Sequence, residues 1–285
     1  MTTEASQTDK SKIKNQKSKI VVLGAGGRMG KALIRCIMEE KAQGLELHGA
    51  VDLWDVPDLG MDAGLMAGTK EAGVKLINNL EEVGKDADVI VDFSSHHGTS
   101  GNAPRIAEWG TAWVIGTTGL NDEELTAINA AAEKTAVVLS GNMSLGINLL
   151  CNLVEAGARA LKGKGYDIEV LERHHNMKKD SPSGTALMLG GAAADGYGWD
   201  LKDVQMDGRT GLPGERPGQE IAFHAIRGGD IVGDHTVMLA GMGELLELSH
   251  RATSRDVFAI GALQAAAWVA GKEARLYSMK DVLGL

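Results

Sequence analysis

Short apolar runs alternate with helical patterns along the first half of the chain. The run Lys19–Leu23 is rich in β-branched residues and ends at a glycine, which is typical of a strand buried on both faces. Further strands are predicted at Leu45–Val51, Val74–Ile77, Asp88–Asp92, Ala112–Ile115 and Ala136–Leu139. Helical spacing appears in Arg28–Glu40, and Asn121 is placed to cap a helix over Asp122–Glu133. This alternation predicts an α/β fold whose N-terminal domain is a doubly wound, Rossmann-like parallel sheet.

The pattern changes near residue 145. Gly146–Leu161 and Pro182–Asp195 are predicted helices, with a strand between them at Ile168–Arg173. Three near-consecutive strands joined by glycine turns then predict an antiparallel meander, at Glu220–Arg227, Ile231–Ala240 and Glu244–His250. A last apolar helix is predicted at Val257–Ala270. The second half is therefore expected to form a smaller α+β domain with a mostly antiparallel sheet.

These patterns divide the chain. We expect a first domain at residues 19–145, a second at 146–255, and a C-terminal segment, 256–285, whose helix packs back on the first domain. Residues 1–18 are polar and Lys-rich, and they lack the apolar stretch of a secretory signal. This composition predicts a disordered tail.

Composition narrows the class of protein. The chain has 285 residues and a net charge of −9, which argues against a nucleic-acid partner. It has no apolar run long enough for a bilayer span, so no membrane partner is expected. Cys36 and Cys151 lie in apolar helical patterns, which favours a reducing compartment and a cytoplasmic location.

Residues 24–30, GAGGRMG, follow a predicted strand and open a predicted helix. The spacing that fits is G-x-x-G-x-x-G, at Gly24, Gly27 and Gly30, whereas a triphosphate-binding P-loop fails on its required Gly and Ser/Thr. Glycines let the backbone approach a pyrophosphate, and the helix start offers N–H groups to it. Asp52 follows the last glycine by 52 − 30 = 22 residues and is placed to bond a ribose hydroxyl of NAD. Nucleotide binding is therefore favoured over an ordinary glycine turn.

Three more predicted strands end in small or hydroxyl-bearing residues, at the sheet edge where such folds bind ligands. The segments are Phe93-Ser94, Gly116 to Gly119 and Ser140 to Met143. His96 and His97 follow the first of these and are interpreted as loop residues.

The stretch Glu172–Ala186, ERHHNMKKDSPSGTA, carries the densest chemistry. It leaves a strand and enters a helix at Pro182. Two histidines and two lysines precede hydroxyls at a helix start, a combination that favours carboxylate binding and proton transfer near neutral pH. A zinc site is not predicted, because no further Cys or His stands at ligand spacing nearby.

The remaining candidates are interpreted as structural. His48, His224, His235 and His250 lie in strand patterns, and no cation stands near Cys151 to activate it as a nucleophile.

These segments resemble the 4-hydroxy-tetrahydrodipicolinate reductases, also called dihydrodipicolinate reductases, of the diaminopimelate and lysine pathway. The resemblance runs from about Lys19 to the C-terminus. It rests on GAGGRMG, on Glu172–Ala186, on the segment 208–239 and on HRATSR at 250–255.

The resemblance implies a role for each matching residue. His174 resembles the proton donor and acceptor, and Lys178 a second proton donor. The substrate-binding positions are His175, Ser183, Gly184, Thr185 and Arg255. The cofactor-binding positions are Gly24, Ala25, Gly26, Gly27, Arg28, Met29, Gly30, Asp52, Gly116, Thr117, Thr118, Ser140, Gly141, Asn142 and Met143. A homotetramer built through the second domain's sheet and a small dicarboxylate substrate are also implied.

Two departures from the family's pattern stand out. Ser181 replaces the usual alanine before PSGT, which is a small change. Many members carry arginine after the ribose-binding acid, whereas here Leu53 follows Asp52. Because that arginine would hold the 2′-phosphate of NADPH, we expect a preference for NADH, with NADPH still possible.

The expected reaction is hydride transfer to C4 of the ring and protonation at C3, with the hydroxylated or dehydrated substrate left open. Two alternatives remain: a nicotinamide oxidoreductase for another small acid, and a non-catalytic NAD-binding sensor.

Overall fold

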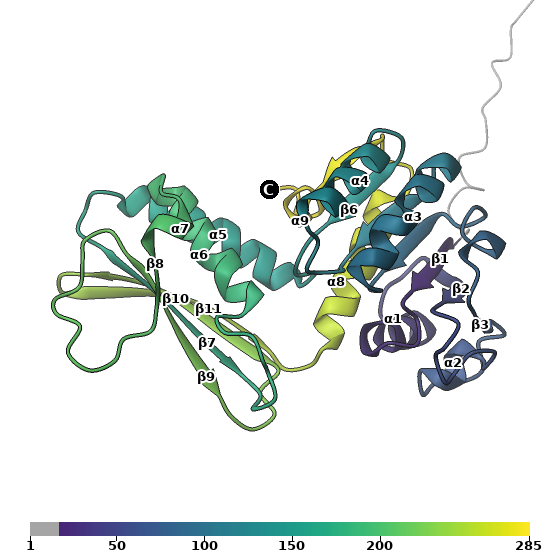
Figure 1. Cartoon of the computed structure of the whole chain (residues 1–285), viewed down its shortest axis with the longest axis horizontal. Helices are drawn as coiled ribbons and strands as arrows, with labels where there is room; N and C mark the ends of the chain where they lie inside the picture. The colour runs from purple at the N-terminus through teal and green to yellow at the C-terminus, as the bar shows by residue number, and fades with distance from the viewer. Residues whose placement is uncertain (1–16) are drawn as a thin grey trace, which may run out of the picture. The chain divides into compact units, whose positions relative to one another are not determined.

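The computed structural model describes residues 17–285, so most of the predicted tail, residues 1–18, lies outside the described part of the chain (Figure 1). The chain forms two compact units. The first unit contains residues up to Val114, Asn121–Val137 and Ala266–Arg275. The second contains Ile115–Leu120, Val138–Ala265 and Leu276–Leu285. Within residues 17–285, no helix combines the length and apolar character that a bilayer span requires.

A seven-stranded sheet has the order β12-β6-β5-β4-β1-β2-β3. Its strands are β1 (Ser18–Leu23), β2 (Leu45–Val51), β3 (Leu76–Ile77), β4 (Val89–Asp92), β5 (Ala112–Ile115), β6 (Ala136–Leu139) and β12 (Arg275–Tyr277). β1 pairs in parallel with both β2 and β4, and Val22 aligns with Ala50 on one side and Val91 on the other. After β1, the strands β2 and β3 are added on one side, and β4, β5 and β6 on the other. The point between β1 and β4 where this order reverses is the switch point at which doubly wound folds bind ligands. The predicted Rossmann-like fold is confirmed.

Helices flank these strands, namely α1 (Arg28–Met38), the single-turn α2 (Ala63–Met66), α3 (His96–Trp109) and α4 (Asp122–Ala132), with a 3-10 turn at Leu80–Glu82. α1 buries Leu33, Cys36 and Ile37, as its apolar spacing predicted. Asn121 caps α4 in a reciprocal capping box with Glu124. The interpretation of His96 and His97 as loop residues is wrong. They are the first two residues of α3, because the Ser95 side chain accepts from Gly98 N and caps the helix immediately before them.

The second sheet has the order β11-β10-β7-β9-β8. Its strands are β7 (Asp167–His174), β8 (Gln205–Asp207), β9 (Ile221–Arg227), β10 (Gly233–Gly241) and β11 (Glu244–Ala252). Figure 1 shows α5 (Leu145–Leu161) and α6 (Gly184–Tyr197) along one face of this sheet, with the short α7 (Leu201–Val204) beyond them. The core between them includes Val154, Ile168, Leu189, Phe223 and Val237.

The predicted meander is wrong at one pairing. β10 and β11 pair in antiparallel fashion, but β9 pairs in parallel with β7, which lies between β9 and β10. Alternate residues of β7, such as Ile168 and Val170, are buried under the helices. β7 therefore occupies the centre of the sheet, with β9 on one side and β10 on the other. The connection between β9 and β10 crosses the end of β7, where Gly228 N donates to the carbonyl oxygen of His174 at 2.9 Å.

The chain ends with α8 (Asp256–Val269), β12 and α9 (Met279–Leu283). α8 matches the predicted last helix to within one residue at each end. β12 joins the first sheet beside β6. This strand has three residues, too few to show a hydrophobic pattern from which it could be predicted. The predicted domain boundaries and the packing of 256–285 remain predictions.

Candidate active site

The glycine loop takes the shape that pyrophosphate binding needs. Gly24 has φ +81°, and a Cβ there would come 2.6 Å from the carbonyl oxygen of Phe93. A Cβ on Gly30 would overlap the backbone of Gly24 and Ala25, so only glycine lets α1 start this close to β1. Gly27 precedes α1 without a side-chain cap, which leaves the N–H groups of the first turn open to an anion.

Asp52 closes this loop from β2. Its Oδ2 accepts from Gly26 N at 2.7 Å, and its Oδ1 accepts from Leu53 N at 2.8 Å. The carboxylate therefore stands beside the loop in a fixed orientation, as the fingerprint of a ribose-binding acid requires.

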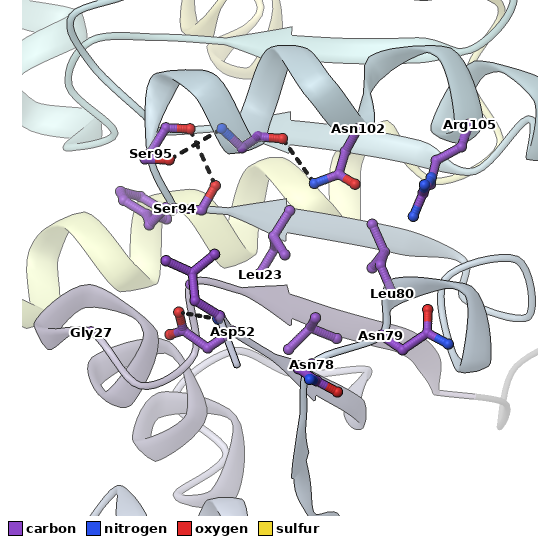
Figure 2. Close-up of a pocket in the computed structure, with 15 residues that line it drawn as sticks. Leu23, Gly27, Asp52, Asn78, Asn79, Leu80, Ser94, Ser95, Asn102 and Arg105 are labelled. Atoms are coloured by element: carbon purple, nitrogen blue, oxygen red, sulfur yellow. Dashed lines mark hydrogen bonds between the residues drawn. The ribbon is translucent and has the colours of Figure 1, made fainter. Parts of the chain in front are cut away.

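A pocket of about 360 Å³ lies between these elements, a size within the range of small-molecule sites (Figure 2). The residues that line it are Leu23, Gly24, Gly27, Val51, Asp52, Leu53, Asn78, Asn79, Leu80, Phe93, Ser94, Ser95, Gly98, Asn102 and Arg105. Figure 2 shows Asp52 at one end of the pocket and Arg105 at the other, with Leu23 and Leu80 between them. The pocket thus joins the ends of β1, β2 and β4, at the switch point between β1 and β4.

The second chemical centre lies at the end of β7 in the other unit. Glu172 is fully buried, and its Oε2 lies 2.6 Å from Nδ1 of His174, two residues along the same strand. Arg227, at the end of β9, donates to both oxygens of Glu172 at 2.7 and 2.8 Å. Ser183 N donates to Oε1 at 3.1 Å. A single carboxylate therefore ties together β7, β9 and the start of α6.

This network sets the protonation of His174. Burial lowers the pKa of His174 below its usual value, and the Glu172 carboxylate partly offsets that effect. Burial alone would raise the pKa of Glu172, but hydrogen bonds from Arg227 and His174 outweigh it and hold that pKa low. With Nδ1 bonded to Glu172, Nε2 is the atom of His174 left to exchange a proton with a ligand.

A cavity of about 30 Å³, room for one or two waters, adjoins His174. Thr185, Asn142, His235 and His250 also line it. Ser183 caps α6, and its Oγ lies 3.1 Å from Nε2 of His235. Burial lowers the pKa of His235 to about 4, which keeps this ring neutral near pH 7.

The structure brings together only part of the predicted cofactor set. Gly24, Gly27 and Asp52 line one pocket, while Ala25, Gly26, Arg28, Met29 and Gly30 belong to the same loop and first turn. Gly116, Thr117 and Thr118 follow β5, and Ser140, Gly141, Asn142 and Met143 follow β6, all in the second unit. Asn142 donates to Oγ1 of Thr185 at 2.8 Å, so this segment contacts the predicted substrate residues.

The predicted substrate residues also divide. Ser183, Gly184 and Thr185 form the start of α6 beside the His174 network. Nδ1 of His175 is buried and has no hydrogen-bond partner among residues 17–285. Lys178 pairs with Asp180 at 2.9 Å, and Arg255 is exposed between β11 and α8. These roles remain predictions.

Glu172 and Arg227 were not predicted as site residues, and His235, which lines the cavity beside His174, was interpreted as structural. Glu172 precedes His174 by two residues on one strand, and this period-2 spacing was a usable signal. Arg227 and His235 reach His174 through strand pairing, since β9 and β10 flank β7. In the nucleotide pocket, Asn79, Asn102 and Arg105 were also missed.

Comparison with known proteins matches both halves of the chain. The family model described as dihydrodipicolinate reductase, N-terminus, matches residues 18–143, and the model described as dihydrodipicolinate reductase, C-terminus, matches residues 146–283. A 4-hydroxy-tetrahydrodipicolinate reductase of Acinetobacter baumannii is 49% identical over 267 residues, which cover 94% of this chain and 96% of that protein. One of Chromobacterium violaceum is 46% identical, over 93% of this chain and 98% of that protein.

Solved structures agree on the fold. A dipicolinate-bound dihydrodipicolinate reductase from Paenisporosarcina sp. TG-14 is similar with a TM-score of 0.72 at 24% identity, covering 92% of this chain and 98% of that one. An amine dehydrogenase from Mycobacterium smegmatis is similar with a TM-score of 0.59 at 14% identity, covering 93% and 96%.

Proposed function

Because this chain belongs to the dihydrodipicolinate reductase family, we propose that it reduces 4-hydroxy-tetrahydrodipicolinate, or its dehydrated form, to tetrahydrodipicolinate. The observation that carries the proposal is that both halves of the chain match the family models. Each half also contains residues suited to one part of the reaction. The first unit has the glycine loop and Asp52, and the second has His174 held by Glu172.

The first unit fits a nicotinamide nucleotide. The uncapped start of α1 suits the pyrophosphate, and Asp52 suits a ribose hydroxyl. When bound, the reduced nicotinamide would supply the hydride to C4 of the dehydrated ring, and a hydroxylated substrate would first lose its C4 hydroxyl as water. The chain's own part is to fix the nucleotide in one orientation and so avoid the entropy loss of a free encounter.

The second unit suits the dicarboxylate and the proton. Gly184 and Thr185 place first-turn N–H groups and the Thr185 hydroxyl at the start of α6, where a carboxylate is favoured, and Ser183 fixes that start through its bonds to Glu172 and His235. His174 in its protonated form donates a proton from Nε2 to C3, and Glu172 stabilises the imidazolium before the transfer. Lys178 serves as a second proton donor near the same loop.

We expect NADH to be preferred over NADPH. The Asp52 carboxylate repels a 2′-phosphate, and Leu53, whose exposed fraction is 62%, offers no charge to balance it. Arg105, the cation of this pocket, stands at the end away from Asp52 (Figure 2).

The cofactor preference is measured as the ratio of kcat/KM for the two nucleotides in the parent and in R105Q. NADH should lead, and R105Q should leave the ratio unchanged. A tenfold higher kcat/KM for NADPH, about 1.4 kcal/mol, would overturn the preference for NADH. If R105Q then lost that NADPH advantage, Arg105 would be the residue that binds the 2′-phosphate.

The open face of the second sheet supports a homotetramer. Leu245 and Ile226 lie on the face opposite α5 and α6 and are 49% and 45% exposed. Light scattering should give four times 30.0 kDa, and Leu245→Asp should lower that mass by disfavouring burial of this face. A monomeric parent would contradict this assembly.

The buried thiols of Cys36 and Cys151 fit a reducing, cytoplasmic compartment.

The reductase function is tested by the loss of NADH absorbance with freshly generated 4-hydroxy-tetrahydrodipicolinate. Turnover by the parent is the expected result. Binding of NADH by calorimetry without turnover would instead indicate a nucleotide sensor.

A further inference from the structure

A cluster of two histidines and a glutamate lies outside the sites described above. His96 and His97 are the first two residues of α3, and Glu124 lies in the first turn of α4. α3 and α4 pack against each other, so the starts of both helices come together in the first unit. This contact uses side chains that neither the nucleotide pocket nor the His174 network employs.

The three side chains converge on one oxygen. Nδ1 of His96 lies 2.7 Å from Oε1 of Glu124, and Nδ1 of His97 lies 3.1 Å from the same oxygen. One ligand atom from each of the three residues lies within 4.8 Å of the others. The rings stand 3.9 Å apart between centroids. The cluster therefore brings together three ligand atoms of the kinds that bind metal ions.

Glu124 is built to present this oxygen. Its Oε2 accepts from Asn121 N at 2.9 Å in the capping box, which holds the carboxylate in place and turns Oε1 toward the histidines. The Glu124 side chain is only 7% exposed, whereas His97 is 79% exposed. A buried, oriented carboxylate thus stands beneath two imidazoles that solvent can reach.

We propose that His96, His97 and Glu124 bind a divalent transition-metal ion of the zinc class. Two imidazole nitrogens and one carboxylate oxygen suit zinc, cobalt or nickel, while magnesium and calcium prefer oxygen ligands alone. A zinc ion about 2.0–2.1 Å from each ligand atom requires those atoms to lie roughly 3.4 Å apart. The distances from Oε1 of Glu124 to Nδ1 of His96 and of His97, 2.7 and 3.1 Å, need only small side-chain rotations to open to that value.

The site should be weaker than a closed structural zinc site. It offers three protein ligands and leaves water in the remaining position. The partial positive charges at the starts of α3 and α4 also oppose a cation. Bound metal would tie the first turn of α3 to α4, next to Ser95 and Gly98 of the nucleotide pocket.

The test uses the full-length protein and Co²⁺ as the probe, with Zn²⁺ as competitor. The d–d absorption of Co²⁺ reports inner-sphere ligands directly and does not depend on reductase turnover. The variant is His97→Gln, because a side chain this exposed can be replaced without threatening the fold. The matched control is His48→Gln, on β2 and outside the cluster.

The parent and the His48→Gln control should show saturable Co²⁺ absorption that Zn²⁺ displaces. Even outer-shell partners of a metal are worth 10–100-fold in affinity, so losing a ligand should raise the Kd at least about tenfold in His97→Gln. Zn²⁺ should also raise the Tm of the parent more than that of His97→Gln. An unchanged Kd in His97→Gln, or no Co²⁺ spectrum in the parent, would overturn the proposal.

Discussion

Replacing Glu172 with glutamine removes the charge that holds His174 while nearly preserving shape. Glu172 accepts one bond from His174, two from Arg227 and one from Ser183 N. Glutamine cannot accept at both ends, so one partner faces an N–H₂ group and loses its acceptor. The imidazolium of His174 also loses its stabilising charge, which lowers the pKa of His174 further.

Two magnitudes follow. Breaking a buried ion pair costs about 3–5 kcal/mol, but the Arg227 side chain is 21% exposed and water can solvate it, so we expect about 2 kcal/mol of lost stability. General acid catalysis contributes about 10²–10⁴-fold, and a displaced, less basic His174 should lose roughly 10²-fold in kcat, or about 2.7 kcal/mol. The KM should change little.

The assay compares kcat, KM and the pH profile of E172Q with those of E169Q. Glu169 is a matched control on the opposite face of β7, paired with Arg209, Arg216 and His224 instead of His174. Both variants should lose stability, but only E172Q should lose kcat and shift to lower pH the limb on which rate falls as pH rises. If E172Q keeps kcat within threefold of the parent, Glu172 does not position His174.

Three further predictions rest on single observations. G30A should raise the Kd for NADH, because its Cβ overlaps Gly24 and Ala25, whereas G101A, with open space around it, should bind NADH normally in the same calorimetric titration. H235Q should make the free energy of unfolding, measured by urea unfolding at a series of pH values, fall less steeply as the pH is lowered. Burial lowers the His235 pKa from 6.5 to about 4, so the unfolded chain binds an extra proton as pH falls through this window, and up to about 3 kcal/mol of stability is lost there in the parent alone. D52N should narrow any gap in kcat/KM between NADH and NADPH, because it removes the charge that opposes the 2′-phosphate, and an unchanged ratio would count against that role of Asp52.

The nucleotide loop could be predicted because its signal is local. Gly24, Gly27 and Gly30 stand in a strand-to-helix turn, and Asp52 ends the next strand, so chain order alone sets their neighbourhood. His174 was predictable for the same reason, and the start of α6 was predicted to within two residues, since the helix expected from Pro182 begins at Gly184 after the Ser183 cap. Each depends on a few consecutive residues whose geometry a strand or helix end dictates.

The partners of His174 depend on which strands pair, and that is not local. The glycine turn between β9 and β10 suggested a hairpin, which would keep β7 away from β10. In the structure β7 lies between them, and this arrangement brings Arg227 and His235 to His174. Arg105 and Asn102 were missed in the same way, since α3 carries them to a pocket formed by β1 and β2.

The role of His174 as proton donor is tested most directly by the kcat of H174Q at saturating NADH and 4-hydroxy-tetrahydrodipicolinate. We expect turnover by the parent and a fall of about 10²–10⁴-fold in the kcat of H174Q, with the Kd for NADH unchanged, because His174 donates the proton and does not hold the nucleotide. A variant that turns over at the parental rate would contradict it and remove His174 from the chemistry.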